Sequence, residues 1–204
     1  FMKILIVCEN YLPYIGGAEI VFKNLAERYV QQGHEVTVLT HRLPNTTKTE
    51  IMNGVQIIRV SSFYSRYFFS FFSIPQAISL AKKHDIIQTT SFNGAPPAWV
   101  ASKISSKPIV ITVHEVWVGR WKEVTNFSWF KCFIHELLER AIYLLPYDQY
   151  VCFSNSTNQY LEKLNLNQKK IITIYNGLDY DFWDRSKITA STIREQFNLQ
   201  AKFV

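Results

Sequence analysis

The chain has 204 residues, enough for one well-buried domain and a little more, and 48% of them are hydrophobic, which excludes a disordered protein. Three Cys cannot form a complete set of disulfides within one chain, and no CxxC or Cys/His cluster suggests a zinc site. The net charge of +6 favours an anionic partner, but it does not choose among nucleic acid, a membrane surface and a phosphorylated small molecule.

The compartment is predicted from the thiols and from the apolar runs. Cys8 and Cys152 each lie inside an apolar run that is typical of a strand, so we expect buried free thiols in a reducing compartment. No apolar run approaches the ~20 residues of a membrane span. The segment from Met2 to Cys8 runs directly into a strand and lacks the form of a secretory signal. We therefore expect a cytoplasmic protein with no bound metal.

Short apolar runs alternate with amphipathic stretches from end to end, which is the pattern of repeated βα units. It predicts an α/β fold with a Rossmann-like, mostly parallel sheet and helices on both faces. The expected strands are Lys3–Cys8, Glu35–Thr40, Val55–Val60, Asp85–Thr89, Ile109–Val113, Gln149–Phe153 and Ile171–Ile174. The expected helices are Ala18–Gln32, Pro75–Lys83, Pro97–Ser105, Phe133–Leu145, Ser156–Leu164 and Thr189–Leu199.

The last residues predict a division into domains. Residues 1–184 are expected to form one Rossmann-like domain, and residues 185–204 a linker helix followed by the start of another domain. Ala201–Val204 is typical of the first residues of a new strand. We therefore expect the sequence to be cut off where a second domain begins.

The diglycine Gly16-Gly17 opens the first predicted helix. Residues without a β-carbon let the backbone approach a ligand closely, and the N–H groups at a helix start favour anions. A phosphate contact is the sharper interpretation, and a tight turn capped by Glu19 is the structural alternative. The loop is too long for the dinucleotide fingerprint G-x-G-x-x-G, which is absent, so an NAD enzyme is disfavoured.

His114 ends the strand Ile109–Val113 and is followed by Glu115. In a parallel sheet, ligands collect beyond the carboxyl ends of the strands. A His at that edge can bond a substrate hydroxyl or carry a proton near neutral pH, although it can also simply tie two loops together. The other four His are expected to be structural: His34, His41, His84 and His135.

Two further polar segments follow predicted strands. Ser154 and Ser156 precede a helix, where they are either caps or part of an acceptor site for a phosphate or hydroxyl. Asn176-Gly177 could be nothing more than a turn.

Two aromatic and basic stretches stand out, residues 63–72 and residues 117–131. Such a composition suits a membrane interface, whereas the alternative is that the rings pack into the core or against a further domain. Nucleic acid is disfavoured, because few Lys or Arg cluster and no recognised binding motif is present.

The chain resembles family 4 glycosyltransferases, the group 1 class with the GT-B architecture of two facing Rossmann-like domains, over residues 2–204. Four segments carry the resemblance, in order and each after the appropriate strand: Pro13 with Gly16-Gly17-Ala18-Glu19, Thr112-Val113-His114-Glu115, residues 151–156, and Ile174-Tyr175-Asn176-Gly177-Leu178-Asp179. Glu115 stands where the family more often has Asp, and Tyr175 where it usually has Pro.

The resemblance implies a retaining hexosyltransferase that moves a sugar from a nucleotide diphosphate sugar to an acceptor hydroxyl of a carbohydrate or glycolipid, without a metal or other cofactor. It implies donor binding by Gly16 and Gly17, a reaction centre at His114, and a cleft with the acceptor bordered by Glu115, Ser154, Ser156, Asn176, Gly177 and Asp179. This half would be the acceptor-side domain, inactive alone and partnered by its own C-terminal domain. Separately from the resemblance, aromatic and basic stretches that face outward would make the protein peripheral at the inner face of the membrane.

Two other classes of function remain open at this point. One is a non-catalytic module that binds a phosphorylated sugar or a glycolipid, and the length of the natural reading frame would decide between it and the transferase. A dehydrogenase or methyltransferase is disfavoured by the loop before the first helix.

Overall fold

The computed structural model describes residues 1–63, 65–181, 183–187, 193–199 and 202. Its centre is an eight-stranded sheet with the order β3-β4-β2-β1-β5-β6-β7-β8. All neighbouring strands are parallel except β3 and β4, which form an antiparallel hairpin at one edge. The strands are β1 (Lys3–Val7), β2 (Glu35–His41), β3 (Thr49–Met52), β4 (Val55–Val60), β5 (Ile86–Thr90), β6 (Ile109–Val113), β7 (Gln149–Cys152) and β8 (Ile171–Thr173).

Helices connect the parallel strands, as the alternating apolar and amphipathic segments predict. They are α1 (Gly17–Gln31), α2 (Arg66–Phe72), α3 (Ile74–Ala81), α4 (Ala95–Ser105), α5 (Trp121–Val124), α6 (Trp129–Leu144), α7 (Asn155–Glu162) and α8 (Ile193–Gln196), with short 3₁₀ turns at Gln168–Lys170 and Arg185–Lys187.

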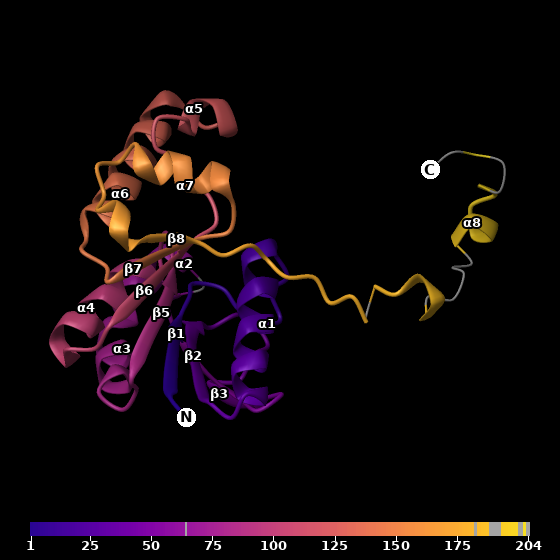
Figure 1. The fold of residues 1–204 in the computed structure, drawn as a ribbon, viewed down its shortest axis with the longest axis horizontal. Coiled ribbons are helices and arrows are strands. Elements are labelled where there is room, and N and C mark those ends of the chain that lie inside the picture. Colours follow the sequence, from indigo (N-terminus) through magenta and orange to yellow (C-terminus); the bar gives the residue numbers. More distant parts are fainter. Residues whose placement is uncertain (64, 182, 188–192, 200–201, 203–204) are drawn as a thin grey trace.

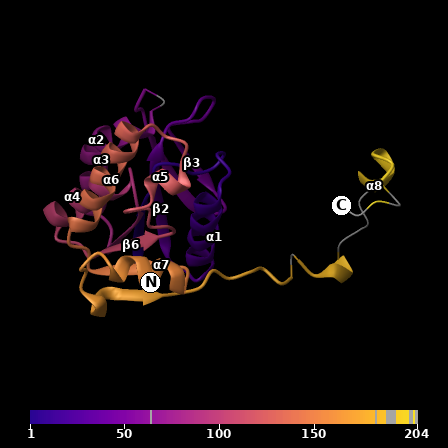
Figure 2. The same cartoon turned by 90° about the horizontal axis from the view of Figure 1, so that it is seen from above.

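The sheet separates two hydrophobic cores. Phe22 and Ala26 of α1 pack with β1, β2 and β4 on one face. On the other face, buried side chains of α2, α3, α4, α6 and α7 pack against the sheet in a larger cluster. The ribbon views show the same division, with α1 on one side and α2, α3, α4 and α6 on the other (Figures 1 and 2). The fold is therefore the expected mostly parallel α/β sheet with helices on both faces.

The strand order reverses at β1, which lies between β2 and β5. The chain moves outward from β1 to β2 through α1 and later crosses to β5, so the loops after β1 and β5 diverge to opposite faces. A crevice opens at such a switch point, beyond the carboxyl ends of the strands. Gly94, the residue before α4, closes the floor of this region, because a Cβ built on it would lie 2.8 Å from the main-chain oxygen of Val7.

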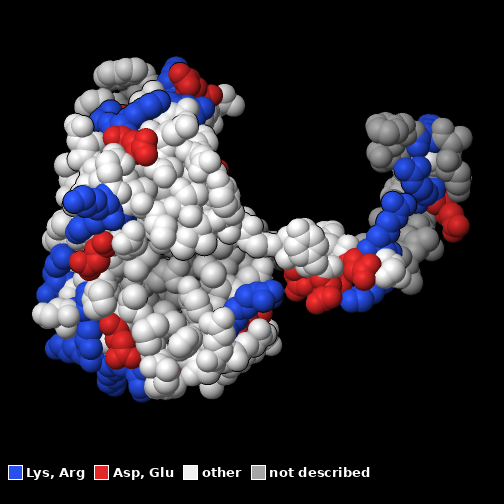
Figure 3. Space-filling view, in the orientation of Figure 1, with Lys and Arg blue, Asp and Glu red and all other residues white. Residues whose placement is uncertain are grey.

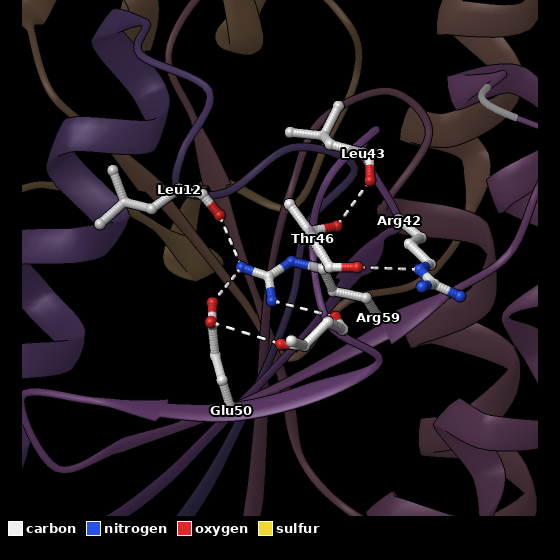
Figure 4. Close-up of polar contacts among 7 residues, drawn as sticks. Leu12, Arg42, Leu43, Thr46, Glu50 and Arg59 are labelled. Carbon is white, nitrogen blue, oxygen red and sulfur yellow. Dashed lines mark hydrogen bonds and ion pairs between the residues drawn. The ribbon is translucent and has the colours of Figure 1, made fainter.

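A buried arginine fixes the edge of the sheet next to this crevice. The side chain of Arg59 in β4 is 1% exposed and pairs with Glu50 of β3. Its guanidinium also donates to the main-chain oxygens of Leu12, at 2.8 Å, and Thr47 (Figure 4). Burying an arginine is costly unless it is paired and hydrogen-bonded. This cluster therefore ties the hairpin β3–β4 to the loop that follows β1.

Two elements differ from the expectations. The strand β3 was not predicted, although Asn53 and Gly54, both at positive φ, form the hairpin turn that joins it to β4. The aromatic stretch 63–72 contains the helix α2, and only Phe69 among its large aromatic residues of known placement is buried.

The packed body ends with β8. Residues 174–179 are extended and exposed and run past α1, where Asp179 approaches Arg28 at 4.0 Å (Figure 1). Of the predicted helix Thr189–Leu199, the described helical part is α8, and residues 188–192 lie outside the described part. The predicted strand Ala201–Val204 also lies outside it, except for Lys202.

Candidate functional site

A cavity of about 570 Å³ lies at the switch point of the sheet. Its walls come from the segments after five strands, β1, β5, β6, β7 and β8, and from the first turns of α1. The lining residues are Cys8, Glu9, Asn10, Gly17, Ala18, Glu19, Val21, Phe22, Thr90, Ser91, Phe92, His114, Glu115, Phe153, Ser154 and Asn176. Five of the nine predicted site residues are thus brought together: Gly17, His114, Glu115, Ser154 and Asn176.

Gly16 and Gly17 have different surroundings in the structure. Gly17 is the first residue of α1 and lines the cavity, and a Cβ built on it meets nothing within 4 Å. A ligand can therefore approach the start of α1 closely. Gly16 is the extended N-cap residue, and a Cβ there would overlap the carboxylate of Glu19. Gly16 makes room for a side chain that itself lines the cavity. Glu19 is the acidic residue of the first turn of α1.

His114 stands at the wall of the cavity between two aromatic rings. Its ring centroid lies 4.8 Å from that of Phe153 and 5.9 Å from that of Phe22. Burial lowers the pKa of His114 to about 4, because it disfavours the charged imidazolium. The buried Nε2 has no hydrogen-bond partner among the described residues. Of the two roles expected for this side chain, the lowered pKa favours a hydrogen bond to a ligand hydroxyl over carrying a proton near neutral pH.

Glu9 is a cavity residue that the sequence analysis did not select. Its carboxylate accepts hydrogen bonds from the main-chain N–H, at 3.2 Å, and the side-chain amide of Asn93. Arg66 of α2 lies 3.6 Å away. Burial raises the pKa of Glu9, and the bonds from Asn93 oppose that rise. The position of Glu9, two residues after β1 at the switch point, is the signal that could have identified it.

The two serines are not equivalent. Ser154 lines the cavity and is the N-cap of α7, because its Oγ accepts from the Thr157 N–H at 3.1 Å. Ser156 is already inside α7 and is exposed outside the cavity. The expectation that both precede the helix is therefore wrong for Ser156.

The segment after β8 contributes one residue to the cavity. Asn176 lines it, whereas Gly177 and Asp179 follow in the extended chain outside the lining. No turn forms at Asn176-Gly177, so the turn interpretation is not realised. Glu115 lines the rim, and its carboxylate accepts from the indole N–H of Trp117 at 2.6 Å.

The charge of the cavity is negative. Glu9, Glu19 and Glu115 line it, and no Lys or Arg is found among the described lining residues. Carboxylates accept hydrogen bonds from hydroxyl groups and repel phosphate. The cavity therefore suits the hydroxyl-rich part of a ligand, and only the start of α1 favours an anion.

The four other His are placed as structural residues. His84 bonds the Leu80 carbonyl and the Thr37 hydroxyl, and His41 bonds the main-chain oxygen of Glu9. His34 and His135 likewise bond main-chain groups. All three Cys are buried and free.

Two general features bear on the class of protein. Within the described parts of the chain, no three His, Cys, Asp or Glu side chains are grouped so that they could hold a metal ion. In the same parts, no helix has the length and apolar character needed to cross a membrane.

Comparison with known proteins agrees with this arrangement. The sequence model of glycosyltransferase family 4 matches residues 15–182. An uncharacterized glycosyltransferase of Methanocaldococcus jannaschii is 31% identical over 196 residues, which cover 87% of this chain and 47% of that protein. Anabaena HepE, solved in complex with UDP-glucose, superimposes with a TM-score of 0.71 at 16% identity, over 100% of this chain and 51% of HepE. Sucrose-phosphate synthase of Thermosynechococcus elongatus superimposes with a TM-score of 0.72 at 17% identity, over 99% of this chain and 54% of the synthase.

The fold is that of one half of a GT-B glycosyltransferase. The chain belongs to glycosyltransferase family 4. These three proteins match most of this chain, but the chain spans only about half the length of each of them.

Proposed function

We propose that this chain is the acceptor-side half of a retaining glycosyltransferase, which transfers a sugar from a nucleotide diphosphate donor to an acceptor hydroxyl. The observation that carries the proposal is the convergence of Gly17, His114, Ser154 and Asn176 on one cavity at the switch point. Family membership supports the reaction class. HepE, which shares the fold, was solved with a nucleotide sugar, and that supports the donor class.

In the proposed reaction, the bond from the anomeric carbon of the sugar to the diphosphate oxygen breaks, and a bond to the acceptor oxygen forms on the same face. The acceptor proton passes to the departing phosphate oxygen. No residue of this chain forms a covalent intermediate. The sugar carries positive charge in the transition state, so nearby carboxylates stabilise it and the start of α1 stabilises the leaving diphosphate.

His114 acts in this scheme through its neutral imidazole. The unpartnered Nε2 bonds a hydroxyl of the transferred sugar and fixes its position relative to the acceptor. Glu9 and Glu19 bond further hydroxyls from the other wall. Because no Lys or Arg is found among the described residues of the lining, most of the charge of the diphosphate is neutralised by the second domain.

The division into domains is part of this proposal. Residues 1–184 provide the acceptor side, and residues 185–204 lead into a donor-binding domain like the second half of the matched proteins. The 204-residue chain alone is then inactive and binds nucleotide sugars weakly. Efficient sugar transfer by this chain alone would contradict the proposal that a second domain is required.

The decisive test uses a polypeptide in which this chain continues into such a second domain. It is screened for transfer from UDP- and GDP-sugars, and the anomeric configuration of the product is determined by NMR. We expect retention, and we expect His114→Ala to lower kcat/KM by at least ~100-fold while folding is kept. Ser156→Ala, outside the cavity, is the matched control. Binding without transfer by the two-domain protein would instead favour a binding module.

A further inference from the structure

Phe92 combines an unfavourable backbone conformation with a place in the wall of the cavity. It lies between β5 and α4, and its φ is +75°. At positive φ the Cβ comes too close to the following carbonyl oxygen, so a bulky side chain is an outlier there. Gly and Asn adopt this conformation at lower cost. The described residues with positive φ include four Asn: Asn45, Asn53, Asn165 and Asn198.

The turn at Phe92 is fixed by contacts that do not involve its ring. The main-chain N–H and the side-chain amide of Asn93 donate to the carboxylate of Glu9. The Phe92 carbonyl accepts from the Ala95 N–H at 3.1 Å. A glycine would hold the same turn without the steric cost of a side chain. Because backbone strain of this kind concentrates at functional sites, the ring itself is a candidate for a function.

Two indoles hold the ring of Phe92 in place. Its centroid lies 6.2 Å from the ring centroids of Trp117 and Trp121, at interplanar angles of 63° and 83°. The indole N–H of Trp117 donates to Glu115 at 2.6 Å, and that of Trp121 to Glu139 at 2.7 Å. Phe92 is only half-buried, and neither indole is stacked on its ring. The ring is therefore oriented by anchored neighbours that do not cover it by stacking.

An aromatic ring in an acidic cavity is suited to a sugar. The C–H groups of a pyranose pack on an aromatic face, while its hydroxyls donate to carboxylates such as that of Glu9. No Lys or Arg is found among the described residues of the cavity lining. Figure 3 shows that Lys and Arg gather along the left-hand margin of the body, whereas the broad surface beside them carries few charges. A neutral, hydroxyl-bearing ligand therefore fits next to Phe92 better than an anion does.

We propose that Phe92 is the stacking platform for the pyranose ring of the acceptor, and that it selects acceptors with an apolar C–H face. This inference rests on the proposed function, which places the donor diphosphate at the start of α1. The helices α1 and α4 cover opposite faces of the sheet, and Phe92 precedes α4 (Figures 1 and 2). A sugar stacked on Phe92 therefore lies across the cavity from that diphosphate.

The first test is saturation-transfer NMR of the 204-residue chain with two simple glycosides. Methyl β-D-glucopyranoside has axial hydrogens on both sides of its ring, whereas methyl α-D-mannopyranoside carries an axial oxygen on each side. We expect saturation of the glucoside to be strongest at the axial hydrogens of one face. We expect the mannoside to bind at least ~3-fold more weakly, because it cannot lie flat on an aromatic ring.

The second test replaces the ring. Phe92→Leu keeps an apolar side chain without a flat face and should raise the Kd of the glucoside by about 5-fold, whereas Phe92→Tyr should stay within about 2-fold. Phe68→Leu, at an exposed ring of α2 outside the cavity lining, is the matched control and should leave the Kd unchanged. Circular dichroism shows whether the variants fold.

A stability measurement separates the ring from the turn. Phe92→Gly should unfold at a higher urea concentration than Phe92→Ala, because only glycine relieves the positive φ. Both variants should nevertheless bind the glucoside as weakly as Phe92→Leu or more weakly. Glucoside binding by Phe92→Gly equal to that of the unmodified chain would show that the ring has no part in binding and would overturn the proposal.

Three further outcomes would overturn it: no saturation of either glycoside, an unchanged Kd in Phe92→Leu, or an equal loss in Phe68→Leu. In a two-domain protein, weaker binding of the donor found in the transfer screen with unchanged glucoside binding would assign the ring to the transferred sugar instead. Failure of the proposed function would appear separately, as absence of transfer by the unmodified two-domain protein, since glycoside binding to the 204-residue chain requires no transfer.

Discussion

The ring centroids of His114 and Phe153 lie 4.8 Å apart, and Phe22 approaches the same imidazole from α1. These contacts place the imidazole of a cavity-lining residue among apolar rings. Burial there lowers the pKa of His114 to about 4, so its imidazole is neutral at physiological pH.

The first prediction concerns the titration of His114. In the folded chain its NMR signals should titrate with a midpoint near pH 4, far below the ordinary value of 6.5. Between pH 4 and pH 6.5 the unfolded chain binds a proton at this His that the folded chain does not bind. The contribution of neutral His114 to the free energy of unfolding is therefore complete above pH 6.5 and is lost as the pH falls toward 4. His114→Gln identifies the signal. A midpoint near 6.5 would contradict the burial argument.

The second prediction concerns Glu139, a buried residue of α6. Its carboxylate accepts from the Trp117 N–H at 2.9 Å and from the Trp121 indole N–H at 2.7 Å, and thereby holds the loop after Glu115. Burial raises its pKa to about 7. The folded chain therefore keeps a proton that the unfolded chain releases near pH 4.5, and stability falls as the pH rises from 4.5 through 7.

Urea unfolding at a series of pH values checks this. We expect Glu139 to account for a loss of about 3 kcal/mol in the free energy of unfolding as the pH rises from 4.5 to 7. In Glu139→Gln this part of the slope should disappear, although the variant gives up one hydrogen bond because an amide has only one acceptor oxygen. Glu123→Gln, on the exposed surface of α5, should keep the slope. An unchanged slope in Glu139→Gln would show that the carboxyl does not titrate there.

Much of the fold could be predicted because its strands are continuous Ile, Val and Leu runs buried on both faces. Strands such as Ile109–Val113 were predicted with the observed bounds. The strand β3 was missed because it has only four residues, of which Ile51 is exposed and Glu50 points to an arginine. The local signal for its pairing with β4 is the turn Asn53-Gly54, which the sequence analysis did not use.

The candidate site was predictable only where position along a strand decides it. Gly17, His114 and Ser154 follow strand ends, so the sheet brings them together. Gly177 and Asp179 belong to an extended segment whose path no local pattern specifies. Glu9 was missed because its importance comes from contacts with Asn93 and Arg66, which are remote in the sequence.

The third prediction concerns Gly94. A Cβ at this position would lie 2.8 Å from the Val7 main-chain oxygen and 3.1 Å from the Cys8 Cα. Main-chain atoms in a central strand cannot move aside, so Gly94→Ala should lower the free energy of unfolding by about 1–3 kcal/mol. Gly177→Ala, where a Cβ meets nothing within 4 Å, is the control for losing a glycine. Equal stability of the two variants in urea unfolding would contradict the close approach.

The fourth prediction concerns Arg59. Replacing it in Arg59→Met removes the partner of Glu50 and leaves the carbonyls of Leu12 and Thr47 without their donor. We expect a loss of about 3 kcal/mol in the free energy of unfolding, since a buried pair is broken from one side. Arg42→Met is the control, because the exposed Arg42 bonds only the Thr46 carbonyl among the described residues and should cost less than about 1 kcal/mol. A similar loss in both would show that burial of Arg59 does not matter.

The main-chain oxygen of Glu9 accepts hydrogen bonds from the Thr40 hydroxyl and the His41 ring of β2. Its carboxylate accepts a hydrogen bond from the side-chain amide of Asn93, which follows β5 on the other side of β1. Hydrogen bonds from both neighbouring strand regions therefore hold Glu9 in place without a ligand. A wall that is already rigid loses little conformational entropy on binding, so contacts made to it contribute more of their strength to affinity. The cavity is therefore preorganised on the β1 side.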